Sequence, residues 1–198
     1  MSVLRVYLNK RILQMAKSKL DGEIRYNAKS ERYAFLSSMY MCSITVKIVE
    51  PEGERLLEFS SAEAAFHYFK TTATPFREKI LSCGLPSKAR YYGSAEAQCP
   101  MRKDWTSTPK GSEHELRFQV MRAIQWAKFT QNSVLAQRLV ETGDVVLKEN
   151  APWEKETYWG TIDGKGENNH GKILMQIRQR LAKGVRPEEL IPDFTKYY

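Results

Sequence analysis

Residues 112–131 constrain the fold of this chain more than any other part of the sequence. They begin with Ser112-Glu-His-Glu115, a capping-box pattern that is typical of a helix start. Apolar residues follow at helical spacing, and larger ones widen the same face: Leu116, Val120, Ala123, Ile124 and Ala127, with Met121, Trp126 and Phe129 beside them. A helix with so wide an apolar face has to be covered on more than one side. We therefore predict that it is the longest helix and lies in the centre of the fold.

Shorter periodic patterns lie before and after this helix. Residues 44–48 alternate between apolar and polar, a turn follows at 51–54, and 55–59 read as a returning strand, which predicts a β-hairpin. Helix patterns or helix starts occur at 3–20, at Ser60, from Thr74 to near Gly84, at Ser87, at 134–142 and at 170–183, and a short strand candidate lies at 145–147. Residues 33–40 fit a strand or a loop equally well. The sequence predicts an α+β fold that is predominantly helical, with a small β element.

The charge of the chain favours an anionic partner. Its 198 residues carry 31 Lys and Arg against 23 Asp and Glu, a formal net charge of +8. Nucleic acid, a nucleotide or a phosphorylated metabolite would match that charge. No apolar run approaches the roughly 18 residues of a membrane span, and the N-terminal residues do not resemble a signal peptide. Because the three cysteines are scattered and lack zinc-type spacing, we expect a cytoplasmic protein with no metal site.

Glu63 is the first candidate for chemistry. It stands near the start of the predicted helix, and Glu63, His67 and Lys70 recur at helical spacing beside the apolar stripe. A carboxylate flanked by cations stays ionised, and it can orient water or stabilise a developing cation. The alternative is structural, with Glu63 closing the capping box of residues 60–63 and Lys70 an exposed neighbour.

A glycine-rich segment, residues 159–171, is the second candidate. Trp159 supplies an aromatic face, Asp163 a carboxylate, and the glycines let backbone N–H groups approach a ligand before a helix begins. These are the parts of a nucleotide or sugar-phosphate site. The alternative is a tight turn, a helix cap and a core Trp. Together Glu63 and Asp163 would suit cleavage of a glycosidic bond through an oxocarbenium-like state, with Trp105 as a further stacking candidate.

Four segments together resemble the NADAR family of YbiA-like proteins. Residues 33–40 (YAFLSSMY) resemble its FLSNFY element, and residues 59–70 resemble its SSEHxFQAxK helix. Residues 120–143 resemble VMxxALxAKFxQNxxLxxxLLxTG, and residues 156–181 resemble DxxWGxGxDGxGxNxLGxxLMxIRxxL. The match implies a NADAR-like catalytic domain at 33–184, preceded by a basic helical arm or extension at 1–32 and followed by a C-terminal tail at 185–198.

The resemblance implies hydrolysis of a ribose–nitrogen bond. Family members act on riboflavin-pathway ribosyl-pyrimidine phosphates, or remove ADP-ribose from modified guanine in nucleic acid. By position, Glu63 and Asp163 would be the catalytic carboxylates. The residues expected to bind or line the substrate site are Trp159, Lys70, Asn168, Gly164, Gly166, Tyr40, Trp105 and Glu156. The chain departs from the family pattern at Ala64, Ser94, Glu156, Ile162 and His170, which bears on the substrate more than on the fold.

We therefore predict an N-glycosidase that needs no cofactor and has no membrane partner. Its substrate would be an ADP-ribosyl group on a nucleobase, most readily guanine in DNA, or a related ribosyl phosphate. ADP-ribosylated nucleic acid is a candidate partner, and no oligomeric state is predicted. Two alternatives stay open. One is a module that binds NAD or ADP-ribose without cleaving it, for which Ala64 and Ser94 would be the signs. The other is a basic protein that contacts only the phosphates of nucleic acid.

Overall fold

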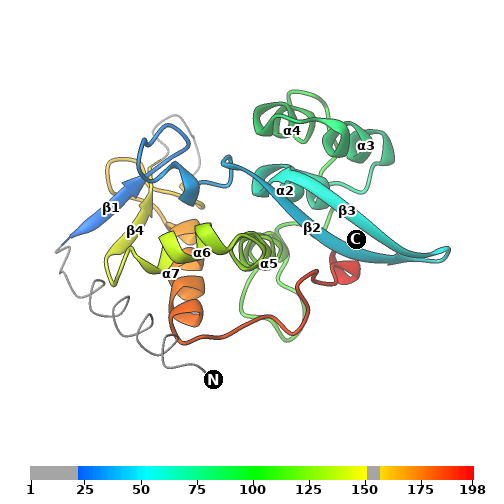
Figure 1. Cartoon of the computed structure of the whole chain (residues 1–198). Coiled ribbons are helices and arrows are strands. Elements are labelled where there is room, and N and C mark those ends of the chain that lie inside the picture. Colours follow the sequence, from blue (N-terminus) through cyan, green and yellow to red (C-terminus); the bar gives the residue numbers. More distant parts are fainter. Residues whose placement is uncertain (1–21, 151–156) are drawn as a thin grey trace, which may run out of the picture. The chain divides into compact units, whose positions relative to one another are not determined.

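The computed structural model describes residues 22–150 and 157–198 of the chain (Figure 1). These residues separate into two compact units. The hairpin unit comprises Ser37–Asn132 and Pro187–Tyr198. The β1–β4 unit comprises the described residues up to Leu36 together with those of Ser133–Arg186. The helix predicted at residues 3–20 lies outside the described residues.

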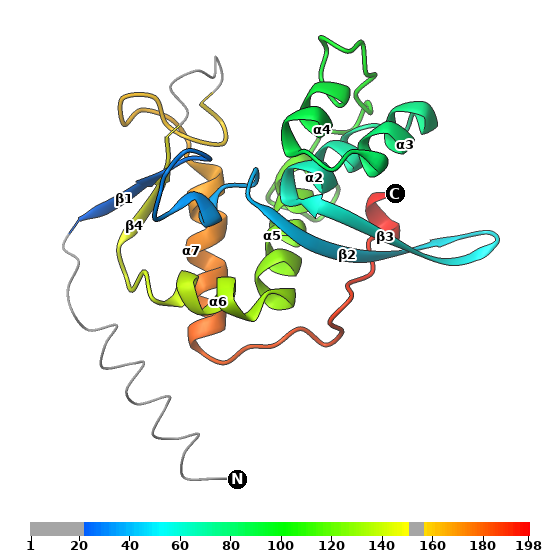
Figure 2. The same ribbon diagram turned by 45° about the horizontal axis from the view of Figure 1, so that its top comes forward.

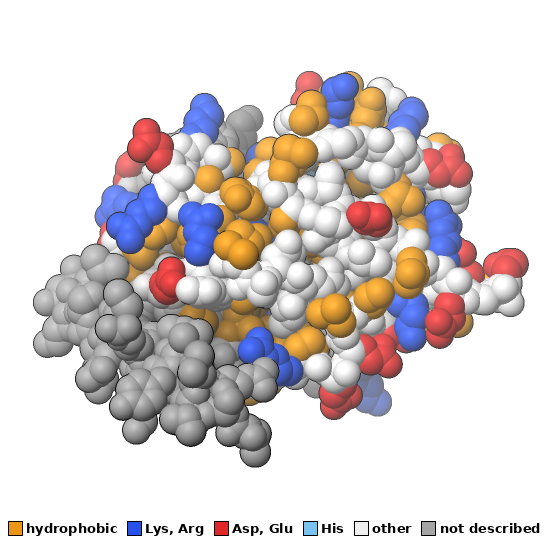
Figure 3. Space-filling view, in the orientation of Figure 1, with side chains coloured by type: hydrophobic (Ala, Val, Ile, Leu, Met, Phe, Trp, Pro, Cys, Tyr) orange, Lys and Arg blue, Asp and Glu red, His pale blue; other side chains and the backbone are white. Residues whose placement is uncertain are grey.

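The hairpin unit is built on two long antiparallel strands, β2 (Met41–Glu50) and β3 (Gly53–Ser61). Buried residues alternate along β2 because successive side chains point to opposite faces: Ile44, Val46 and Ile48 are fully buried. This confirms the predicted hairpin. Figure 2 shows the hairpin projecting past the helices to its turn, and Figure 3 shows acidic side chains near that tip.

Four helices pack on this hairpin or on one another: α2 (Ala62–Lys70), α3 (Thr74–Ser82), α4 (Pro86–Tyr92) and α5 (Leu116–Gln131). Helix α5 packs against both α2 and β2, and its 16 residues make it the longest helix of the described residues, as predicted. The predicted capping box was wrong. The N-cap of α5 is Glu115, and Ser112 Oγ instead accepts a hydrogen bond from His114 N at 3.1 Å within the preceding turn.

The C-terminal segment pairs with β2 through backbone hydrogen bonds. Lys47 N donates to Pro192 O at 2.9 Å, and Phe194 N donates to Lys47 O at 2.7 Å, ahead of the short 3-10 helix η2 (Thr195–Tyr197). Phe194 is buried, and its ring centroid lies 5.2 Å from that of Phe69 on α2. The predicted tail therefore contributes to the hydrophobic core of the hairpin unit.

The β1–β4 unit contains a parallel pair of strands, β1 (Glu23–Tyr26) and β4 (Val146–Glu149). Helix α7 (Asn169–Ala182) packs on β4, and α6 (Ser133–Val140) packs on α7. The strand predicted at 145–147 and the helices predicted at 134–142 and 170–183 are confirmed, and each of their ends is shifted by one or two residues. Strand β1 was not predicted, and it lies within the segment expected to be an arm.

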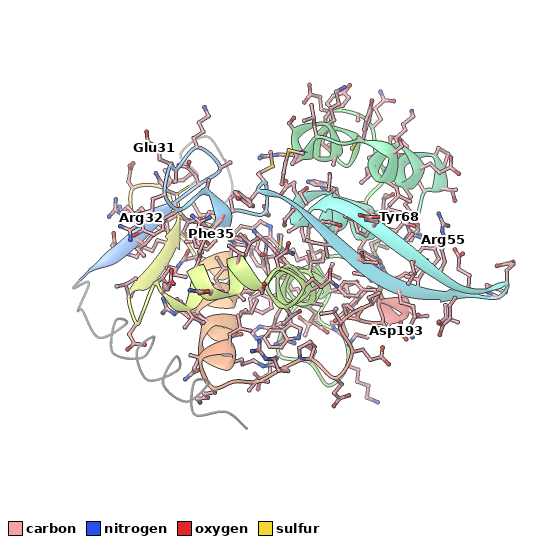
Figure 4. The ribbon with its side chains drawn as sticks, viewed as in Figure 1. Glu31, Arg32, Phe35, Arg55, Tyr68 and Asp193 are labelled. Carbon is pink, nitrogen blue, oxygen red and sulfur yellow. The ribbon has the colours of Figure 1, made fainter. Side chains whose placement is uncertain are left out.

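The segment 33–40 forms a loop that contains the 3-10 helix η1 (Ala34–Leu36). Within the β1–β4 unit, the guanidinium carbon of Arg138 lies 4.0 Å from the centroid of the Phe35 ring, and Arg138 also donates to Arg32 O at 2.8 Å. Figure 4 labels Phe35 on this loop and Arg32 just before it. Among the helices of the described residues, none combines the length and the apolar character that crossing a bilayer requires.

Candidate active site

Glu63 lies in the first turn of α2, where both of its carboxylate oxygens have partners. The N-cap of α2 is Ser61, one residue later than predicted, and its Oγ accepts a hydrogen bond from Ala64 N at 3.1 Å. Glu63 does not serve the predicted capping box. Its Oε2 accepts a hydrogen bond from Ser38 Oγ at 2.6 Å, and its Oε1 lies 3.2 Å from His67 Nε2. The side chain is thus held from two elements while only 8% of the residue is exposed.

The surroundings of Glu63 keep it ionised. Burial raises the pKa of the carboxyl group, but the hydrogen bond and charge of His67, the hydrogen bond from Ser38 and the charge of Arg90 outweigh it and lower the pKa to about 2. The carboxylate is therefore charged at every ordinary pH. A fixed, buried charge acts more strongly on a ligand than the same charge in water, because little solvent screens it.

A single carbonyl organises the other end of this cluster. Gly93 O, at the end of α4, accepts a hydrogen bond from Lys70 Nζ at 3.1 Å and lies 3.3 Å from His67 Nδ1. The two ring nitrogens of His67 thus face two oxygen atoms, Gly93 O and Glu63 Oε1. A Cβ atom on Gly93 would lie 2.4 Å from His67 Nδ1, so only glycine allows this approach. Glu63 contacts His67 directly, and Lys70 is linked to His67 through Gly93 O, in agreement with the predicted shared face.

Lys128 is a buried cation of the hairpin unit that the sequence reasoning missed. It is fully buried on α5, its Nζ donates to Ser37 O at 2.8 Å, and it lies 5.8 Å from the centroid of the Tyr40 ring. The sequence carried a signal, since Lys128 lies one helical turn after Ile124 on an apolar face. Ser38 and Arg90 were also missed, because they reach Glu63 from other elements.

Trp105, a predicted stacking residue, is part of the core. It is 3% exposed, and its ring centroid lies 5.0 Å from that of Phe66. A ring covered on this scale presents little face to a ligand, and the stacking role of Trp105 remains a prediction.

In the β1–β4 unit, Asp163 and Gly164 form the tip of a tight turn. Ile162 and Lys165 exchange two backbone hydrogen bonds of 2.9 Å, and φ is +49° at Asp163 and +78° at Gly164. Two left-handed residues between paired strands are the signature of a two-residue hairpin turn, which Asp-Gly favours. The turn leaves the Asp163 side chain exposed. Trp159, before the turn, is half-buried, with its ring edge-on to Tyr158 at a centroid distance of 4.8 Å.

Asn168 has a structural role at the start of α7. Its backbone is left-handed, with φ +53°, and its side chain reaches β4, where Nδ2 donates to Leu147 O at 2.8 Å and Oδ1 accepts from Glu149 N at 3.1 Å. The amide therefore completes the backbone pairing of β4. A Cβ atom on Gly171 would lie 2.2 Å from Leu147 O, so this glycine lets α7 approach β4 closely.

The first N–H groups of α7 have partners within the protein. Asn169 N donates to Tyr158 O at 3.2 Å, and His170 N donates to Trp159 O at 3.0 Å. These are the groups that a phosphate at a helix start would use. The predicted phosphate contacts of this turn, including those of Gly164 and Gly166, remain predictions.

A buried polar cluster lies at the start of α7. His170 is 1% exposed, and its Nδ1 lies 2.7 Å from the hydroxyl of Tyr26 and 3.6 Å from Glu149 Oε2. Burial raises the pKa of Tyr26 well above its ordinary value, so the phenol stays protonated. The cluster ties β1 and β4 to the start of α7.

The predicted site residues are distributed over both units. Glu63, Lys70, Tyr40 and Trp105 belong to the hairpin unit, whereas Trp159, Asp163, Gly164, Gly166 and Asn168 belong to the β1–β4 unit. Glu156 lies outside the described residues. That Glu63 and Asp163 share one site remains a prediction. Over residues 22–150 and 157–198, no group of three or more His, Cys, Asp or Glu side chains is placed to hold a metal ion.

Known proteins match this chain over most of its length. Riboflavin biosynthesis protein VVA0006 of Vibrio vulnificus is 33% identical over 169 residues, which cover 83% of this chain but 40% of that protein. N-glycosidase YbiA of Escherichia coli is 35% identical over 120 residues, which cover 59% of this chain and 68% of the relative. The chain thus spans less than half the length of the Vibrio relative.

The fold and the family agree with these relatives. The NMR structure of the E. coli protein YbiA matches with a TM-score of 0.65 and 28% identity, covering 84% of this chain and 88% of that one. This confirms the predicted α+β fold. The family model of the NADAR domain matches residues 25–182, which includes the second half of β1 and so begins before the predicted start at residue 33. With that match over most of its residues, the chain belongs to the NADAR domain family.

Proposed function

We propose that this chain is an N-glycosidase that hydrolyses a ribose–nitrogen bond, with Glu63 as its principal catalytic carboxylate. The observation that carries the proposal is a buried carboxylate, held by Ser38 and His67, that stays ionised at about 8% exposure. Relatives named N-glycosidases support the reaction class. The substrate in this proposal is an ADP-ribosyl group on a nucleobase, with guanine in DNA first, or a related ribosyl phosphate.

The low pKa of Glu63 selects among the roles that a carboxylate can play. A carboxylate with a pKa of about 2 is a weak base, so it is poorly suited to act as the general base that takes a proton from water. Its charge is instead well suited to an oxocarbenium ion, because the charge is present before the reaction begins and needs no reorganisation. Glu63 therefore stabilises the cation and orients the attacking water.

The bond changes in this reaction balance as a simple hydrolysis. The bond from ribose C1′ to the base nitrogen breaks, and its electron pair leaves with the nitrogen. Water oxygen forms a new bond to C1′, one water proton remains on the new hydroxyl, and the other goes to the departing base through solvent or an acid. We extend the proposal to Asp163 as the assisting carboxylate and to Trp159 as a ring that stacks on the substrate.

Turnover tests the proposal directly. The full chain is incubated with an oligonucleotide bearing ADP-ribosylated guanine and, separately, with the ribosyl-pyrimidine phosphates of riboflavin synthesis, and products are separated by liquid chromatography. We expect Glu63→Gln to lower the rate by about 100-fold or more, in line with the loss of one preorganised electrostatic group. Glu78→Gln, which removes an exposed carboxylate from α3, is the matched control and should retain the wild-type rate.

Two results would contradict the proposal. One is the absence of product from every substrate, and the other is a wild-type rate in Glu63→Gln. Calorimetry with ADP-ribose separates the main alternative, since tight binding without any product would assign the chain to the non-catalytic binding modules.

A further inference from the structure

A basic hollow lies in the hairpin unit, between α3 and α4. Its volume is about 290 Å³, and it is lined by Lys79, Ser82, Cys83, Gly84, Leu85, Lys88 and Tyr92. The volume equals that of roughly ten water molecules at about 30 Å³ each, which is room for a phosphate with its attached sugar rather than for a lone ion. Figure 3 shows Lys and Arg side chains on the surface at this end of the unit.

Helical spacing places these side chains together. Lys79, Ser82 and Cys83 are three and four residues apart at the end of α3, so they share a face. Lys88 and Tyr92 are four residues apart on α4 and share a face in the same way. The short link through Gly84 and Leu85 then closes one end of the hollow.

The hollow carries positive charge without a compensating acid. Its lining contains two lysines, two hydroxyl groups and no Asp or Glu. The Cys83 thiol donates to Ile80 O at 3.1 Å, and burial raises its pKa, so it stays neutral and adds no negative charge. Lys79 and Lys88 are exposed. Such a site attracts an anion and offers donors to its oxygens.

We propose that this hollow binds a backbone phosphate of the nucleic acid that carries the modified base. The inference deepens the proposed function and rests on it. Small metabolites are usually held in enclosed, largely apolar pockets, whereas backbone phosphates are bound by exposed cations that position the strand without reading its sequence. An open hollow with two exposed lysines fits the second case.

Helix α4 connects this hollow to Glu63. Lys88 and Tyr92 line the hollow, and Arg90, two residues from each of them, points to another face of α4. The charge of Arg90 contributes to the low pKa of Glu63, so α4 carries side chains that act on both places. In this proposal a strand with its modified nucleotide at Glu63 runs past α4 and presents a nearby phosphate to the hollow.

The salt dependence of binding tests this assignment. Fluorescence anisotropy measures the affinity of the full chain for a short, unmodified single-stranded oligonucleotide over a series of salt concentrations. Each phosphate contact contributes about 0.7 to the slope of log K against log salt for single strands. We expect Lys79→Gln/Lys88→Gln to bind more weakly and to reduce that slope by about 1.4. The double variant Lys103→Gln/Lys183→Gln removes the same charge from exposed positions outside the hollow and should keep the wild-type slope.

Other outcomes overturn the inference and leave the proposed function to be judged separately. An unchanged slope in Lys79→Gln/Lys88→Gln overturns it, and so does an equal loss in the control. If those substitutions abolish NMR shifts caused by inorganic phosphate but leave the oligonucleotide slope unchanged, the hollow takes a free phosphate and the nucleic-acid assignment is wrong. Turnover of a small ribosyl phosphate should be retained in Lys79→Gln/Lys88→Gln and lost in Glu63→Gln. Failure of the glycosidase proposal would therefore appear in the turnover assay and not in the binding assay.

Discussion

The low pKa of Glu63 predicts how the stability of this protein depends on acid. Folding lowers the pKa of this carboxyl group from its ordinary 4.5 to about 2. A pKa that falls on folding contributes stability above the unfolded value, and the contribution is lost as the pH falls towards the folded value. At about 1.4 kcal/mol for each pKa unit, the whole contribution is roughly 3 kcal/mol.

Most of this contribution disappears in an accessible pH range. The two pKa values imply that about 2 kcal/mol is lost between pH 5 and pH 3. Urea unfolding followed by circular dichroism at both pH values should therefore show that the wild-type chain loses about 2 kcal/mol more than Glu63→Gln. Comparing the two losses cancels the titration of the other acids, which both chains share.

A control and a direct titration complete this test. Glu78→Gln, which removes an exposed acid, should lose as much stability as the wild type. Carbon NMR of the Glu63 carboxyl group should give a midpoint near pH 2, and His67→Gln should raise it, because His67 contributes both a hydrogen bond and a charge. An equal loss of stability in wild type and Glu63→Gln, or a midpoint near 4.5, would refute the reasoning.

Two further predictions concern the β1–β4 unit. Gly171→Ala should lower stability by about 1–3 kcal/mol, because its Cβ atom would lie 2.2 Å from Leu147 O. The control Gly84→Ala, whose Cβ atom would meet nothing within 4 Å, should change stability by less than about 0.5 kcal/mol. Thermal unfolding of both variants checks this. His170→Leu should cost about 1–3 kcal/mol, because it leaves the buried hydroxyl of Tyr26 without its hydrogen-bond partner, and a stability equal to wild type in urea would count against the cluster.

The sequence predicted the elements whose signals are local. The hairpin followed from the alternation at Ile44, Val46 and Ile48, and the central position of α5 followed from its wide apolar face. The left-handed turn at Asp163 and Gly164 agrees with the preference of Asp-Gly for such turns. Strand β1 could not be predicted in this way, since its four residues are stabilised by a partner strand far along the chain.

The candidate site shows the same division. The spacing of Glu63 and His67 predicted their contact because both lie on one helix. Ser38 and Gly93 join them from a loop and from the end of another helix, and no short-range pattern indicates that. Asn168 shows a role that the sequence did not indicate, since its side chain supplies hydrogen bonds that β4 would otherwise lack, while its predicted contact with substrate remains a prediction.

The pairing of residues 192–194 with β2 bears on how the chain matures during synthesis. The ribosome releases β2 and the helices that follow it long before Phe194, whose buried ring completes their packing. The core of the hairpin unit is therefore completed only after residues 192–194 have been synthesised. Until then Phe69 and the edge of β2 are exposed to solvent and to other nascent chains. Substitutions of Phe194 should therefore increase the dependence on chaperones during translation as well as lower the stability of the finished protein.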